Sequence, residues 1–171
     1  YESGSACKKA FEDVFRPMVD PKWYDNPNSW LSTPHISDVL DQYMDTYPEF
    51  KWYGATPQDI FHPMVCSSYD GICNINIEKL LKDGITKIGV VFNLDDHTQG
   101  GSHWVGLYSN FNTGGIYYFD STGNPPQKDT IRLMRDIYNQ GNRLILEGKH
   151  KVDDTHCVNC NGDVIDENHV Y

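Results

Sequence analysis

The sequence predicts an α+β fold, and three observations lead to that prediction. Helical periodicity marks the first part of the chain, three strand-like runs follow between residues 86 and 120, and another helical stretch comes after them. Helices and strands are therefore grouped along the chain, whereas a doubly wound parallel sheet would alternate them.

Two helices are expected before the sheet region. Residues 6–18 read as a short amphipathic helix, and residues 19–31, rich in Pro, Asp, Asn and Trp, as an irregular segment. The second helix is clearer: Thr33 is the expected N-cap, Pro34 takes the first helical position, and apolar residues recur at helical spacing up to Tyr47.

The middle of the chain changes from helical to strand periodicity. Residues 50–74 read as a loop, and a short helix is expected from Ile75 to Lys82, where Asp83-Gly84 ends it. Three apolar strands follow, at residues 86–94, 103–109 and 115–120. Asn112-Thr113-Gly114 is typical of a hairpin turn, so the last two strands are expected to pair.

The remaining chain completes the predicted domain. Residues 128–139 carry a helical pattern and residues 143–147 a short strand-like run. We therefore divide the chain into an N-terminal extension with a short helix (1–30), a core (31–147) and a polar C-terminal tail (148–171).

Composition limits the class of protein. The 171 residues suit one domain, and the 39% apolar residues can build a core. With 14 Lys+Arg against 24 Asp+Glu the net charge is −10, so we expect no nucleic acid and no membrane surface as partner. The longest apolar run, near residues 88–92, is far shorter than the ~20 residues of a membrane span. No signal-peptide pattern opens the chain and no Met begins it, so we expect a processed or trimmed polypeptide.

The hairpin predicts a contact between His103 and Asp120. If the strands pair around residue 112, these residues lie directly opposite each other or are offset by at most one residue, at one end of the sheet. A carboxylate at that distance fixes the tautomer of an imidazole and stabilises the imidazolium. A solvated cross-strand pair without a catalytic role is the alternative, because a one-residue change of register would put the two side chains on opposite faces.

A cysteine thiol is the candidate nucleophile that would complete a catalytic group with His103 and Asp120. The five cysteines are an odd number in a chain of this length, which favours reduced thiols in a reducing compartment over a disulfide scaffold. Cys66 and Cys73 read as buried or incidental thiols. Cys157 and Cys160 form a CxxC pair that, with nearby histidines (His150, His156, His169), offers a weak zinc alternative.

Two extended motifs carry a resemblance to a known family. The run GVVFNLDDHTQGGSHWVGLYSN, followed by GGIYYFDSTGNPPQKDTIRLMRDI, resembles the core of the Ulp1-like (adenain-type) cysteine proteases of large DNA viruses. WLSTPHISDVLDQY is similar to the N-terminal segment of that family. The resemblance covers roughly residues 30–140 and implies a central mixed or antiparallel sheet with helices on both sides.

The resemblance also implies an activity and its residues. His103 would be the general base, Asp120 its orienting partner and Trp104 an aromatic shield of the pair. Taken as a single residue, Trp104 is better explained as an ordinary core side chain. The loop before His103 carries Asp95-Asp96-His97. Two acids and a histidine suggest a metal at first glance, the family implies a place at the cleft rim instead, and solvated loop charge is the simplest interpretation. Gly101 would let a substrate backbone approach closely. We expect a thiol endopeptidase that processes virion or ubiquitin-like precursors, with no cofactor and no metal.

The nucleophile is where the sequence departs from the family. The family places its cysteine in a Gln…Cys-Gly context on an apolar helix, whereas Val158 follows Cys157 and the residues beyond it are polar. Cys157 could be a degenerate nucleophile, the true cysteine could lie beyond residue 171, or the nucleophile could be gone. In the last case the alternative function is a catalytically inactive structural or minor capsid component. We expect the protein in the virion or the host cytoplasm.

The predicted strand at residues 86–94 is apolar on both faces and needs cover on both. The tail after Gly148 is too polar to provide it. Missing residues or a partner chain, such as a capsid protein, are therefore expected to complete the core.

Overall fold

The computed structural model describes residues 20–68 and 71–153, which form two compact units. The first unit ends at Tyr47 and the second begins at Pro48. The expected helix at residues 6–18 and the tail from residue 154 onward lie outside the described residues.

The first unit contains two helices, α2 (Lys22–Asp25) and α3 (Thr33–Thr46). α2 was not expected, because residues 19–31 read as irregular. α3 begins one residue earlier than predicted: Ser32 is the N-cap, and its backbone N–H donates to Nδ1 of His35 at 3.3 Å. Pro34 is still tolerated there, because the N–H groups of the first turn have no helical acceptor.

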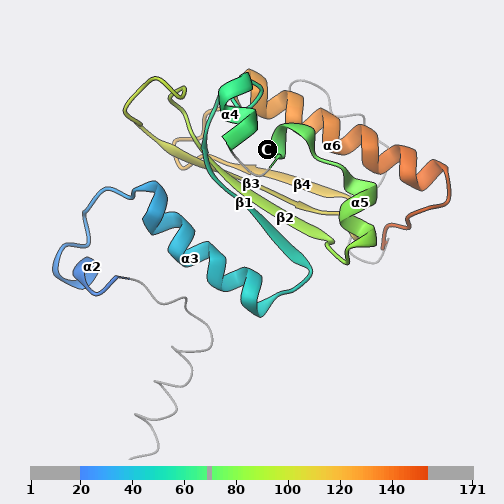
Figure 1. The fold of residues 1–171 in the computed structure, drawn as a ribbon, viewed down its shortest axis with the longest axis horizontal. Coiled ribbons are helices and arrows are strands. Elements are labelled where there is room, and N and C mark those ends of the chain that lie inside the picture. Colours follow the sequence, from blue (N-terminus) through green and yellow to red (C-terminus); the bar gives the residue numbers. More distant parts are fainter. Residues whose placement is uncertain (1–19, 69–70, 154–171) are drawn as a thin grey trace, which may run out of the picture. The chain divides into compact units, whose positions relative to one another are not determined.

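The second unit is built on a mixed four-stranded sheet with the strand order β1-β2-β3-β4 (Figure 1). β2 pairs in parallel with β1, and antiparallel pairs join β2 to β3 and β3 to β4. The strands are β1 (Phe50–Pro57), β2 (Lys87–Asn93), β3 (Trp104–Asn110) and β4 (Gly115–Phe119). The α+β fold with a mixed sheet is therefore confirmed.

β1 and the elements after it correct the predicted loop at residues 50–74. β1 carries Gly54 at φ 95°, at the point where its register with β2 is irregular, and it ends in Pro57. These residues hide the strand periodicity, while the parallel partner lies beyond a long crossover. The segment also contains α4 (Pro63–Ser68) and η1 (Ile72–Asn74). Cys66 and Cys73, expected as single thiols, form a disulfide with Cα atoms 5.6 Å apart.

The last helix is longer than predicted. α6 runs without a break from Lys128 to Leu146, so the strand expected at residues 143–147 is wrong. Leu144 is buried on the same face of α6 as Leu133 and Ile137. A short apolar run does not distinguish a strand from a buried helical turn by periodicity, and here packing decides.

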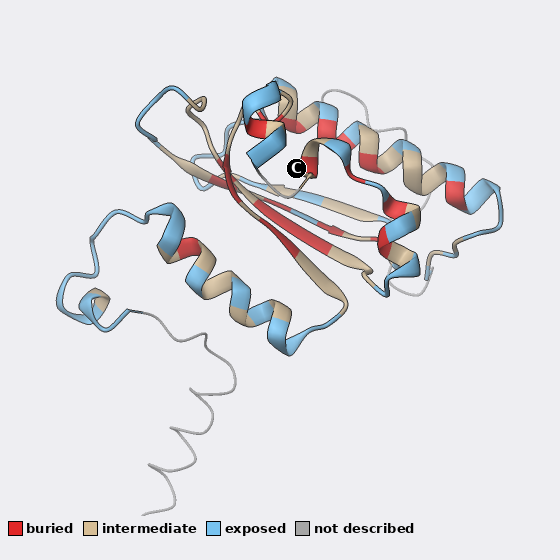
Figure 2. Cartoon of the chain, viewed as in Figure 1, coloured by how far each residue is buried: buried red, intermediate tan, exposed pale blue. Residues whose placement is uncertain are grey.

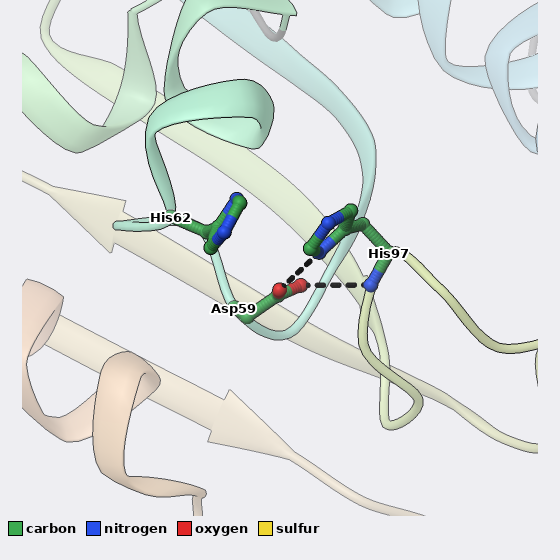
Figure 3. Close-up of side chains that lie close together, drawn as sticks. All are labelled: Asp59, His62 and His97. Carbon is green, nitrogen blue, oxygen red and sulfur yellow. Dashed lines mark hydrogen bonds and ion pairs between the residues drawn. The ribbon is translucent and has the colours of Figure 1, made fainter.

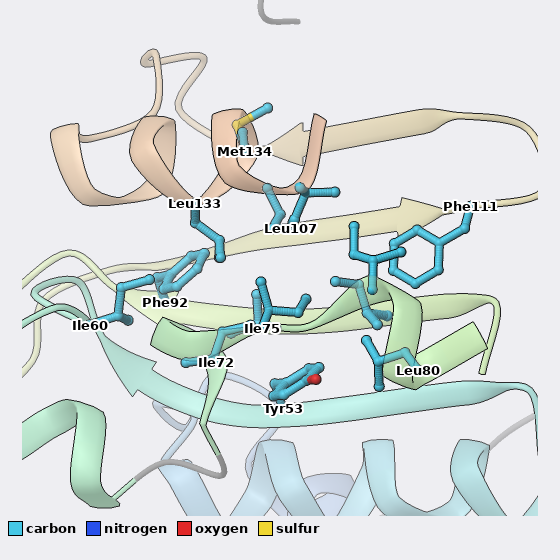
Figure 4. Packing of buried hydrophobic residues seen from close by; sticks show 14 of the residues in the cluster. Tyr53, Ile60, Ile72, Ile75, Leu80, Phe92, Leu107, Phe111, Leu133 and Met134 are labelled. Carbon is cyan, nitrogen blue, oxygen red and sulfur yellow. The ribbon is translucent and has the colours of Figure 1, made fainter. Parts of the chain in front are cut away.

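The core lies between one face of the sheet and the helices that cover it (Figures 2 and 4). Alternate residues of β2 and β3 point into it, and α5 (Ile77–Lys82) and α6 supply the facing side chains. Its fully buried side chains include Ile60, Ile72, Ile77, Ile88, Val90, Phe92, Leu133, Ile137 and Leu144. The described part of the chain contains no helix long and apolar enough to cross a membrane.

Candidate active site

The sheet topology brings three connecting segments to one edge. Because β1 and β2 run in parallel and β3 returns antiparallel, the ends of β1 and β2 lie at the edge where β3 starts and β4 ends. The turn after Pro57, the loop 94–103 and the segment after Phe119 therefore meet there (Figure 1). Loops positioned by a rigid sheet are a common place for reactive side chains.

His103 and Asp120 contact each other at this edge. Nε2 of His103 lies 2.6 Å from Oδ1 of Asp120, and the Asp120 side chain is 1% exposed while the His103 side chain is 29% exposed. The contact was predicted, but the register differs: Gly106 pairs with Phe119, which places Val105 across from Asp120. The pair is thus diagonal, and an offset of two residues keeps both side chains on one face.

Thr122 holds the carboxylate of Asp120 in its ionised form. Its backbone N–H and its hydroxyl both donate to Oδ1, each at 2.8 Å. The Thr122 N–H and the His103 contact lower the pKa of Asp120 to about 2. At neutral pH the carboxylate is therefore only an acceptor, so Nε2 of His103 is the donor. A neutral His103 then keeps its lone pair on Nδ1, where it can accept a proton.

The loop before His103 is held by its own hydrogen bonds. Oδ1 of Asn93 accepts the backbone N–H groups of Asp95 at 3.0 Å and Ser102 at 3.1 Å. The Asp95 carboxylate accepts from the Gly101 N–H at 2.9 Å and the Ser102 hydroxyl at 2.7 Å. Asp95 is therefore a structural member of the loop and not only solvated charge. This network fixes the backbone that leads into His103.

Gly101 has a clear backbone reason to be glycine. Its φ is 90°, and a Cβ at this position would lie 2.7 Å from Nδ2 of Asn93. Its expected contact with a substrate backbone stays a prediction. Trp104 opens β3 and is half-buried, and its expected shielding role also stays a prediction. Cys157 lies outside the described residues.

Sequence reasoning missed Thr122 and a second cluster at the same edge. The signal for Thr122 was present, because Asp-Ser-Thr-Gly is typical of a turn in which an Asp side chain accepts a nearby backbone N–H. The second cluster contains Asp59, His62 and His97. Asp59 and His97 are 38 residues apart in sequence, and no local pattern connects them.

Comparisons with known proteins find one similar sequence and two similar structures. No family model matches the chain. The chain is 39% identical over 123 residues to a protein of Acanthamoeba polyphaga mimivirus named "Putative thiol protease R355", a match that covers 69% of this chain and 39% of that protein. The chain therefore spans well under half the length of this relative.

A solved structure shows the fold. The protease pS273R of African swine fever virus superposes with a TM-score of 0.58 at 22% identity, over 80% of this chain and 51% of the viral chain. The SUMO protease Ulp1 gives a TM-score of 0.45 at 20% identity, over 76% of this chain and 55% of Ulp1. The mimivirus relative and the African swine fever virus protease confirm the resemblance found in the sequence motifs.

Proposed function

We propose that this chain, whose core has the fold of the viral Ulp1-like cysteine proteases, is the His–Asp part of a thiol endopeptidase. One observation carries the proposal: the contact of 2.6 Å between Nε2 of His103 and the buried carboxylate of Asp120. The mimivirus relative named as a thiol protease supports the same reaction class. The proposed substrate is a virion or ubiquitin-like precursor protein.

The proposed mechanism follows from the tautomer. With Asp120 ionised and holding Nε2–H, Nδ1 of His103 accepts the proton of a cysteine thiol. The thiolate attacks the peptide carbonyl carbon and forms a thioester, and the imidazolium returns its proton to the leaving amine. Water then hydrolyses the thioester with His103 again acting as base. Asp120 orients the ring and stabilises the imidazolium that forms in each step.

The nucleophile is proposed to be Cys157, with Cys160 or a cysteine in a longer form of the protein as the alternatives. Because the chain spans 39% of the length of its relative, the experiment uses the full-length protein. It is treated with a thiol-directed probe that ends in Gly-Gly, and mass spectrometry identifies the labelled cysteine. The variants are His103→Gln, Cys157→Ser and Cys160→Ser, with His35→Gln in the first unit as the matched control.

The outcomes separate the two functions. Labelling of one cysteine that requires His103 but not His35 supports the endopeptidase. Equal slow labelling of all exposed cysteines, unchanged in His103→Gln, contradicts it. That result would instead favour the catalytically inactive structural or capsid component.

A further inference from the structure

Asp59, His62 and His97 form a compact cluster of metal-ligand side chains (Figure 3). Each offers one ligand atom, and these atoms lie within 4.8 Å of one another. Asp59 and His62 belong to the turn after β1, whereas His97 belongs to the loop between β2 and β3. The cluster therefore joins two segments that are distant in sequence.

The three side chains are already oriented toward each other. The Asp59 carboxylate accepts the backbone N–H of His97 at 3.0 Å, and its other oxygen lies 2.5 Å from Nδ1 of the same residue. The rings of His62 and His97 stack with centroids 4.2 Å apart. The side chains of Asp59 and His97 are only 24% and 23% exposed. Asp59 and His97 therefore have little rotamer freedom to lose when a ligand binds, whereas His62 is exposed and is positioned by its ring contact with His97.

We propose that Asp59, His62 and His97 bind one divalent transition-metal ion of the zinc class. Two imidazoles and one carboxylate are the ligand set of many three-ligand zinc sites, in which water takes the fourth position. The ion would lie between Nδ1 of His97 and the Asp59 carboxylate, in place of the proton on Nδ1. The neutral ring of His97 would then carry its one proton on Nε2. The adjacent carboxylates of Asp95 and Asp96 add negative charge that favours a cation.

The proposal does not depend on the proposed protease activity. A bound ion would tie the turn after β1 to the loop that ends at His103. It also differs from the expectation of no metal and from the zinc alternative at Cys157 and Cys160.

The experiment titrates the full-length protein with Zn²⁺ by calorimetry and with Co²⁺ by absorption spectroscopy. Asp59→Asn, His62→Ala and His97→Gln are each expected to weaken binding at least about tenfold, as loss of a ligand or its orienting partner does. His35→Gln is the control for a histidine outside the cluster. Cys157→Ser/Cys160→Ser is the control for a site in the tail, and it should bind as the wild type does.

The Co²⁺ spectrum adds an independent readout. A site of imidazole and carboxylate gives no thiolate-to-cobalt charge-transfer band, whereas a site in the tail would give one. Asp59→Asn is nearly isosteric, and its melting curve without metal shows whether the fold is intact. Lack of stoichiometric binding by the wild type, binding unchanged in all three variants, or binding lost only in the cysteine variant would each overturn the proposal.

Discussion

At the scale of single residues, a comparison with Asp96 shows what distinguishes Asp120. Asp96 and Asp120 are each followed two positions later by a threonine whose N–H and hydroxyl bond to Oδ1. Of the two, Asp120 alone also has a hydrogen bond with Nε2 of His103. The shared turn lowers the pKa of both carboxyls, and the contact with His103 supports the proposed orienting role of Asp120.

Asp120→Asn should reduce the rate of probe labelling by about 10²- to 10⁴-fold, because the amide no longer fixes the His103 tautomer or stabilises its imidazolium. Asp96→Asn removes an equivalent turn carboxylate without a catalytic contact and should leave the rate within about twofold. Second-order labelling rate constants of the full-length protein test both. An equal decrease of the labelling rate in both variants would contradict the proposed catalytic role of the His103–Asp120 contact.

The low pKa of Asp120 predicts a stability change in acid. Its pKa is about 2 in the folded chain, against about 3.9 when unfolded. The ionised group therefore stabilises the fold fully above pH ~4, and this contribution is lost as the pH falls from ~4 through ~2. The stability difference between the wild type and Asp120→Asn should shrink over that range in urea unfolding. A difference that stays constant down to pH ~2 would contradict the assigned pKa.

At the scale of single elements, the conformation of the loop between β2 and β3 depends on Gly101. Gly101→Ala forces a left-handed backbone on a residue with a Cβ and pushes it against Asn93, which holds Asp95 and Ser102. We expect a loss of about 1–2 kcal/mol in unfolding free energy, together with slower probe labelling. Gly100→Ala is the control, because a Cβ there meets nothing within 4 Å. Similar unfolding midpoints for the two variants would contradict this account.

Gln140 joins α6 to the start of α5. Its side-chain oxygen accepts the N–H of Ile77 and its amide donates to the carbonyl of Ile75, each at 3.0 Å. Gln140→Ala leaves both backbone groups without these partners and should cost about 1–3 kcal/mol. Asn139→Ala, at an exposed position of the same helix, should change the unfolding free energy by less than ~0.5 kcal/mol. Denaturant unfolding measures both.

At the scale of the whole molecule, the edge strand β4 leaves aromatic side chains exposed. On the helix-covered face Phe92 is completely buried, whereas Phe119 is 71% exposed and Tyr117 54% exposed at β4, the edge strand. The expectation that missing residues or a partner cover an apolar face stays a prediction. Its location becomes specific, because these aromatic side chains are the ones that such a partner would bury.

Two phenylalanine variants measure this difference. Phe92→Ala should cost about 3–5 kcal/mol because it leaves a cavity in a packed core. Phe119→Ala should cost less than ~0.5 kcal/mol in the 171-residue chain, since most of its ring already contacts water. A much larger cost for Phe119→Ala in a longer form of the protein would show that additional residues cover this face.

Local sequence determined the elements whose signals are contained within a few residues. The apolar run of β2, the turn between β3 and β4 and, to within one residue, the start of α3 were predictable because periodicity and turn residues act locally. The His103–Asp120 contact was predictable for the same reason. A hairpin sets the distance between its own ends, and an error of two residues in register does not change the face.

Only the tertiary structure reveals the elements and contacts that depend on residues far apart in the sequence. β1 is a strand because it pairs with β2, and Leu144 is helical because it continues α6 and packs in the core. The Cys66–Cys73 bridge is more local, since it joins α4 to η1 across seven residues. The approach of Asp59 to His97, 38 residues apart in sequence, by contrast results from how two loops meet at one end of the sheet. Such contacts gain their free energy only when the whole domain is folded. A single sequence therefore does not reveal them residue by residue.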